Sequence, residues 1–139
     1  MITEEIQFLN ESSFEKFRNE IDDIKSKLIE KLLLFKSKGF TLCGYGGGLK
    51  AATLLNWLAM PDLEYTVDKD PYKVGKFIPG LNLPILEVGT LETDETKKVM
   101  INLAINFNEE VESSLFSLLK NGDIIVHVFP EMKFVEINK

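Results

Sequence analysis

The sequence predicts an α/β fold in which helices cover both faces of a mostly parallel sheet. Two observations predict it. Short apolar runs alternate with helix-forming stretches along the chain, which is typical of parallel strands joined by crossover helices. The run at 41–45 then passes through glycines at 44, 46, 47 and 48 into a stretch rich in Ala and Leu. A strand that opens into a helix through glycines indicates a Rossmann-like, three-layer α/β/α sandwich.

A long amphipathic helix is predicted at 12–38. Ser12 and Glu15 have the spacing of a capping box, and Gly39 is a stop signal. The apolar residues between them recur at steps of three and four: Phe14, Phe17, Ile21, Ile24, Leu28, Leu32 and Phe35. We expect residues 1–39 to form an N-terminal segment and a helix that packs on the domain. The alternative is that the apolar stripe meets a partner chain or a second copy.

The second predicted unit, residues 40–139, holds the remaining elements. Strands are expected at 40–46, 63–67, 97–105 and 123–129, with residues 133–137 pairing at an edge. Helices are expected at 49–60, stopped by Pro61, and at 106–122. Between them lies a stretch of about twenty residues, 68–86, with three prolines and no helical period, and loops of that length are usually functional or mobile.

Composition excludes several classes of function. A net charge of −6 argues against a nucleic-acid binder, because such proteins neutralise phosphates with clustered Lys and Arg. One cysteine and one histidine exclude a disulfide within the chain and a thiolate metal cluster, and we expect no metal. We expect no membrane association, because no apolar run approaches the roughly 20 residues of a membrane span. The N-terminus does not resemble a secretory signal, so we expect a cytoplasmic protein.

The glycine turn is the main candidate site. Gly46, Gly48 and Ala51 fit the G-x-G-x-x-A spacing, and the first turn of the following helix favours a phosphate or another anion. Asp68 follows the next strand, where a ribose-binding acid is expected in a dinucleotide-binding oxidoreductase. Lys50 opposes the helix dipole unless an anion is bound there. The alternatives are a turn that needs glycine with nothing bound and a solvated surface lysine.

Four further residues have structural interpretations. His127 lies in an apolar strand, where a hydrogen-bonded core histidine is expected rather than a catalytic base. Cys43 is expected to be a small buried apolar side chain. Asn106 or Asn108 could cap the helix that follows, and the position after a strand also suits a ligand contact.

Four segments together resemble the C-terminal domain of the sugar C-methyltransferases, which methylate a deoxysugar carried on a nucleoside diphosphate. The segments are "GYGGGLKAATLLNWL", "YTVDKDPYKVGKFIPGLNLPIL", "AINFNEEV" and "VFPE", within about residues 40–132. The most specific part is the D-x-x-P-x-K-x-G-x-x-x-P-G run, residues 68–80. Gly47 and Gly48 stand where the family usually has Ala or Pro, and Ile105 replaces its Trp.

The resemblance implies a Rossmann-like domain that helps to hold a nucleotide or a nucleotide-diphosphate sugar. The ligand-binding residues that it and the glycine turn suggest are Tyr45, Gly46, Gly47, Gly48, Lys50, Asp68, Lys73, Asn106 and Phe107. No catalytic residue is identified. The family's zinc and S-adenosylmethionine domains have no counterpart in this sequence, so the resemblance implies that methyl transfer needs a partner chain with an S-adenosylmethionine domain. The alternatives are a dinucleotide-binding oxidoreductase and a non-catalytic interaction module.

Overall fold

The sheet of this protein has the strand order β3-β2-β1-β4-β5-β6. The computed structural model describes residues 2–59 and 62–139, and its strands are β1 Thr41–Tyr45, β2 Tyr65–Asp68, β3 Ile85–Glu87, β4 Lys98–Asn102, β5 Ile124–His127 and β6 Lys133–Glu136. Every neighbouring pair is parallel except β5 and β6, which are antiparallel. The α/β fold with a mostly parallel sheet is therefore confirmed, including the edge strand near the C-terminus.

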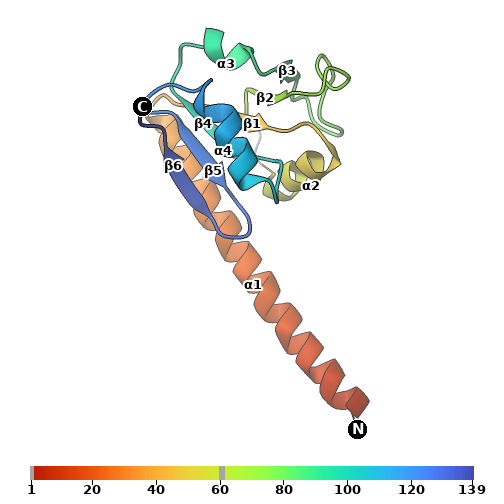
Figure 1. Ribbon diagram of the computed structural model, residues 1–139. Coiled ribbons are helices and arrows are strands. Elements are labelled where there is room, and N and C mark those ends of the chain that lie inside the picture. Colours follow the sequence, from red (N-terminus) through yellow and green to blue (C-terminus); the bar gives the residue numbers. More distant parts are fainter. Residues whose placement is uncertain (1, 60–61) are drawn as a thin grey trace.

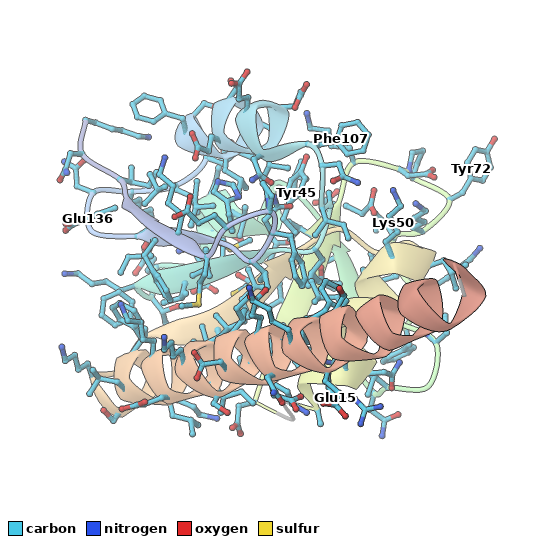
Figure 2. All side chains as sticks on the ribbon, turned by 90° about the horizontal axis from the view of Figure 1, so that it is seen from below. Glu15, Tyr45, Lys50, Tyr72, Phe107 and Glu136 are labelled. Atoms are coloured by element: carbon cyan, nitrogen blue, oxygen red, sulfur yellow. The ribbon has the colours of Figure 1, made fainter. Side chains whose placement is uncertain are left out.

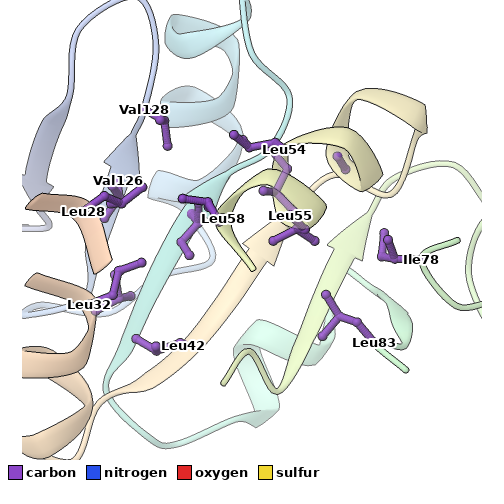
Figure 3. Packing of buried hydrophobic residues seen from close by; sticks show 14 of the residues in the cluster. Leu28, Leu32, Leu42, Leu54, Leu55, Leu58, Ile78, Leu83, Val126 and Val128 are labelled. Atoms are coloured by element: carbon purple, nitrogen blue, oxygen red, sulfur yellow. The ribbon is translucent and has the colours of Figure 1, made fainter. Parts of the chain in front are cut away.

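Helices cover both faces of the sheet and make three layers (Figure 1). One face is covered by α1 (Ile2–Ser37) and α2 (Leu49–Leu58), and the other by α3 (Thr90–Thr93) and α4 (Asn108–Phe116). Figure 3 shows the first of these two cores, where leucines of α1 and α2 meet the sheet. The fully buried residues shown there include Leu28, Leu32, Leu42, Leu55, Leu58 and Val126.

The long helix begins ten residues before the predicted start. It passes through Ser12 as helix, so the capping-box prediction at Ser12 is wrong. Residues 2–11 contain no glycine or proline and have helix-compatible side chains, and nothing in them ends the helix. With 36 residues α1 spans about 54 Å, and its N-terminal half projects away from the other elements (Figure 1). Its C-terminal half is packed on the domain through Ile24, Leu28 and Leu32.

The end of α1 is held firmly against β1. Gly39 adopts the left-handed conformation, with φ +92°, and the Phe40 N–H donates to the Phe35 carbonyl over 3.1 Å. The two phenyl rings meet edge to face with their centroids 5.2 Å apart. A glycine in this conformation, a hydrogen bond from an N–H to the carbonyl five residues earlier and an apolar contact together make a Schellman-type helix end. It confirms Gly39 as the stop signal.

Three smaller features differ from the sequence-based prediction. Residues 69–84 do form a long loop, but the chain then adds β3 beside β2, a strand of three residues that is too short to show a pattern in the sequence. The single turn of α3 was not predicted either. Finally, α2 ends at Leu58, where Ala59 turns left-handed with φ +52°. Pro61, the predicted stop, lies outside the described residues.

A buried ion pair lies at the end of the sheet where the parallel strands begin. The side chain of Lys98 is fully buried, and its Nζ donates to the carbonyls of Asp94 and Thr96, 2.7 Å from each. Its third neighbour is Asp123 Oδ2, at 3.8 Å. Asp123 also accepts the backbone N–H of Lys98 and of Lys120 over 2.9 Å. The pair thus ties β4 to the turn before β5.

A second polar group lies beside it. The Tyr65 hydroxyl donates to Asp94 Oδ2 over 2.6 Å, and both Tyr65 and Cys43 are buried. Burial raises the pKa of the Cys43 thiol to about 12, and burial together with the bond to Asp94 also raises the pKa of Tyr65. Burial tends to raise the pKa of Asp94, but hydrogen bonds from Thr96 and Tyr65 lower it by more. Cys43 is the small buried side chain that its sequence position predicted.

Removing the buried ammonium group should be costly. Lys98→Met leaves the Asp123 carboxylate buried without its cation, and we expect the free energy of unfolding to fall by about 3–5 kcal/mol. The matched control is Lys97→Met, since Lys97 is exposed and should change stability by less than about 0.5 kcal/mol. Urea unfolding of the two variants measures both values. Equal stability of the two variants would contradict the role given to Lys98.

The buried thiol predicts a loss of stability in alkaline solution. Above pH 9 the unfolded chain releases the Cys43 proton while the folded chain keeps it, so the free energy of unfolding falls as pH rises, by up to about 1.4 kcal/mol per pH unit for this group. Cys43→Ala removes the thiol, so its stability should fall less steeply between pH 9 and pH 10. Urea unfolding at several pH values measures the slopes, and identical slopes would refute this account.

Candidate functional site

The candidate site lies where the order of the sheet changes direction. β1 is flanked by β2, reached through α2, and by β4, so the connections that leave β1 and β4 run to opposite sides. In open parallel sheets, ligands bind at this point, outside the carboxyl ends of the strands. Here the glycine turn follows β1, and a loop with Asn106 and Phe107 follows β4.

The glycine turn is fastened to β2 by backbone and side-chain bonds. The Gly46 N–H donates to the Val67 carbonyl over 2.8 Å, and the buried Thr66 hydroxyl donates to the Gly46 carbonyl over 2.6 Å. Gly46 has φ +119°, a conformation that other residues rarely adopt. A Cβ at this position would lie 3.4 Å from the Ala104 nitrogen. The turn is therefore pressed between β2 and the loop after β4.

Neighbouring glycines permit close packing. A Cβ on Gly47 would lie 2.9 Å from Ile85 Cδ1, and one on Gly44 would lie 2.6 Å from Leu103 Cδ1. Both distances are shorter than carbon atoms tolerate. Three of the four glycines at 44–48 are thus explained by contacts within the protein, as the alternative interpretation of the turn expected. Gly48 is the exception.

Gly48 lies at the N-terminus of α2 and faces a lysine. Its φ of −86° is open to any residue, and the neighbour found within 4 Å of a Cβ built there is the Lys73 ammonium, at 3.3 Å. The N–H groups of the first turn of α2 have no carbonyl partner within the helix. Lys50 lies exposed in that first turn. One end of α2 thus combines free N–H groups and the positive end of the helix dipole with two lysine side chains.

Asp68 holds this arrangement in place. Its Oδ2 accepts the Gly47 N–H and its Oδ1 accepts the Asp70 N–H, each over 2.8 Å. Lys73 Nζ lies 3.9 Å from Oδ2. The sequence predicted Asp68 as a ribose-binding acid, and the structure gives its carboxylate a bond to the glycine turn that sequence spacing did not suggest.

The loop after β4 presents two predicted ligand residues to solvent. Asn106 is exposed with φ +78°, and Phe107 is 53% exposed. The N-terminal cap of α4 is Phe107, and no side chain caps the helix there. The prediction that Asn106 or Asn108 caps this helix is therefore wrong. Asn108 instead donates to the Phe129 carbonyl over 3.1 Å, across to the loop after β5.

A buried polar chain under this loop was not recognised in the sequence. Asn102, at the end of β4, accepts the Ala104 N–H and places its amide nitrogen 2.9 Å from Asn108 Oδ1 and 3.0 Å from His127 Nδ1. Because that amide donates, His127 Nδ1 accepts, and its Nε2–H donates to Glu112 Oε1 over 2.7 Å. His127 is thus the hydrogen-bonded core histidine that the sequence predicted. This series of hydrogen bonds fixes the shape of the loop after β4.

The predicted site residues gather at one end of the sheet. In Figure 2 the labelled Lys50 and Phe107 lie on the side of the molecule away from Glu136, and Tyr45 lies between them and Glu136. Tyr72, from the long loop, also lies at the site end and is 81% exposed, although the sequence did not single it out. Tyr45 itself is half-buried. The structure brings together residues from β1, α2, the long loop and the loop after β4.

An apolar cavity adjoins the site. It has a volume of about 390 Å³ and lies between α1, the outer side of α2 and the loops after β4 and β5. Its lining is mainly apolar, and Lys50 is the charged residue in it: Ile21, Leu49, Lys50, Thr53, Leu54, Trp57, Ile105 and Phe129. Trp57 and Phe129 face each other with ring centroids 6.0 Å apart. Lys50 therefore belongs both to the first turn of α2 and to the lining of this cavity.

Two features are absent from the described part of the chain. Within residues 2–59 and 62–139, no three His, Cys, Asp or Glu side chains are placed to hold a metal ion. Across the same ranges, no helix has the length and apolar character needed to cross a membrane.

Comparison with known proteins adds one finding. A family model described as "C-methyltransferase C-terminal domain" matches residues 1–130, which include the whole of α1 as well as the glycine turn, the long loop and the loop after β4. A search of curated proteins found no match.

The last two glycines of the turn, Gly47 and Gly48, should respond differently to an added methyl group. Gly47→Ala places a Cβ against Ile85, and overpacking of this kind should lower the free energy of unfolding by about 1–3 kcal/mol. Gly48→Ala meets the flexible end of Lys73 and should cost less than about 1 kcal/mol. Thermal or urea unfolding compares the two variants. Gly48→Ala being the more damaging change would contradict the described packing of the turn.

Proposed function

We propose that this chain, which belongs to the C-methyltransferase C-terminal domain family, binds the diphosphate of a nucleotide or of a nucleotide-diphosphate sugar at the glycine turn. The observation that carries the proposal is the arrangement at the start of α2, where Gly48 opens the helix and the Lys73 ammonium lies beside it. This matches the residue types and the position at which parallel α/β sheets hold phosphates.

The charges support an anionic ligand. Lys50 and Lys73 bring two positive charges to the first turn of α2, and the helix N-terminus adds about half a charge. Asp68 offsets part of this, since its Oδ2 lies 3.9 Å from Lys73 Nζ. The local charge remains positive in a protein whose net charge is −6. A diphosphate near Lys50 would also remove the conflict between this lysine and the helix dipole.

The rest of the ligand would have two neighbours. Phe107 and Tyr72 are exposed aromatic side chains at the same end of the sheet, suited to contact a base or a sugar ring. Asn106, exposed next to Phe107, supplies an amide that can donate and accept hydrogen bonds. In this proposal Tyr45, Gly46, Gly47 and Asp68 shape the turn, while Lys50, Lys73, Asn106 and Phe107 face the ligand.

For methyl transfer, the proposal assigns this chain the part of a substrate-holding module. The site described above has one glycine turn, and we propose that the methyl donor, S-adenosylmethionine, binds to a domain of another chain. This chain alone would then bind a nucleotide-diphosphate sugar without methylating it.

A thermal-shift panel tests the proposal. At a hundredfold excess over its dissociation constant, a thymidine or uridine diphosphate sugar should add about 2.7 kcal/mol to the stability of the folded chain. Lys50→Ala should weaken binding about tenfold or more, because a hydrogen bond to a charged group is worth roughly 1.5–3 kcal/mol. The control Lys97→Ala removes a lysine just before β4, at the opposite end of the strands, and should leave binding unchanged.

Each other outcome of the panel has a definite meaning. A shift with NAD and none with nucleotide-diphosphate sugars would favour a dinucleotide-binding protein over the one proposed. No shift with any of these ligands, in a chain whose folding is verified by circular dichroism, would overturn ligand binding at the glycine turn.

A further inference from the structure

The outer turns of α1 expose an apolar stripe. Phe17, Ile21, Ile24 and Leu28 follow one another at steps of three and four, so they share one side of the helix. Leu28 is fully buried on the domain and Ile24 packs beside it, whereas Phe17, two to three turns further out, is 59% exposed. Of the side chains described at residues 13–20, all are exposed. The packed stripe therefore continues past the edge of the domain into solvent (Figure 1).

The apolar positions on the side of the helix that carries Phe17 form a symmetric pattern. They occur at steps of four, three, five, three and four, which is the same in both directions: Ile2, Ile6, Leu9, Phe14, Phe17 and Ile21. By the helical period, Phe8 falls outside this stripe. Its centre lies between Glu11 and Ser12. A helix with such a pattern presents matching positions to a second copy of itself that runs the opposite way. A helix in a protein also owes most of its stability to packing of its apolar side.

We propose that residues 2–21 of α1 pair antiparallel with the same residues of a second copy of this chain, around a two-fold axis near Glu11 and Ser12. Position 17 of one copy lies opposite position 6 of the other, and position 21 lies opposite position 2. The contact is isologous, because each copy uses the same surface, and it closes as a dimer.

Charge selects the antiparallel direction. Residues 2–11 carry three glutamates and no lysine or arginine, whereas in residues 12–20 Lys16 and Arg18 balance Glu15 and Glu20. An antiparallel pair puts the acidic turns of one copy beside the neutral segment of the other, with position 5 opposite Arg18. A parallel pair would put the two acidic segments side by side, where like charges repel. Opposed helix dipoles favour the same direction.

The pairing also supplies a cover for the apolar cavity. Ile21 lines that cavity, and the nearby Leu49 is 80% exposed. With position 2 opposite position 21, the first turn of the partner's helix reaches the mouth of the cavity. Two exposed apolar features, the stripe at Phe17 and the cavity rim at Leu49, are then covered by one contact.

Light scattering on the full chain, from about 1 to 200 μM, tests the dimer. The native chain should be a dimer at the upper end of this range, and Phe17→Glu should weaken the dimer at least tenfold. Ser26→Glu is the matched control, since it adds the same charge at an exposed position of the same helix outside the paired segment, and it should leave the dimer intact. A native chain that stays monomeric at 200 μM, or a dimer insensitive to Phe17→Glu, would overturn the proposal.

Cysteine cross-linking tests the direction, because Cys43 is buried. Ser13→Cys lies near the two-fold axis and should form a disulfide with its counterpart on mild oxidation. Glu20→Cys lies on the same side of the helix as Ser13 but far from the axis, and should not. In a parallel pair every residue faces its own counterpart, so efficient cross-linking through Glu20→Cys would rule out the antiparallel pair.

Discussion

The site depends on one steric constraint, the narrow passage that the backbone takes as it leaves β1. On one side Val67, Thr66 and Asp68 bond the turn to β2, and on the other the chain after β4 approaches within contact distance of Gly46. No side chain fits in this passage at positions 44 and 47 without displacing a neighbour. The position of α2, and of the N–H groups and lysines at its start, follows from that passage.

The two ends of the sheet use their buried polar groups differently. At the amino ends of the strands, Lys98 and Asp123 satisfy each other and nearby backbone groups inside a closed interior. At the carboxyl ends, hydrogen bonds link Asn102 to His127 and His127 to the half-exposed Glu112. They support a loop whose outer residues remain open to solvent. One end is built for stability, and the other supports an accessible surface.

The fold could be predicted because its signals are local: strand alternation, helical period and the glycines of one turn. The start of α1 could not, because a capping box at Ser12 does not end a helix that nothing upstream interrupts. Asp68 and His127 form hydrogen bonds with residues 21 and 15 positions away in the sequence. Sequence spacing alone does not reveal such partners. β3 could not be predicted because three residues are too few to show the alternation of a strand. Their pairing with β2 defines them as a strand.

The edges of the sheet limit how this protein can aggregate. β3 offers only three residues to an incoming strand, and β6, antiparallel to its neighbour, carries exposed Lys133 and Glu136 at its ends. Short edges and edge charges discourage the strand-to-strand addition that leads to amyloid-like growth. A chain rich in parallel strands and in apolar side chains is thereby protected from open-ended polymerisation.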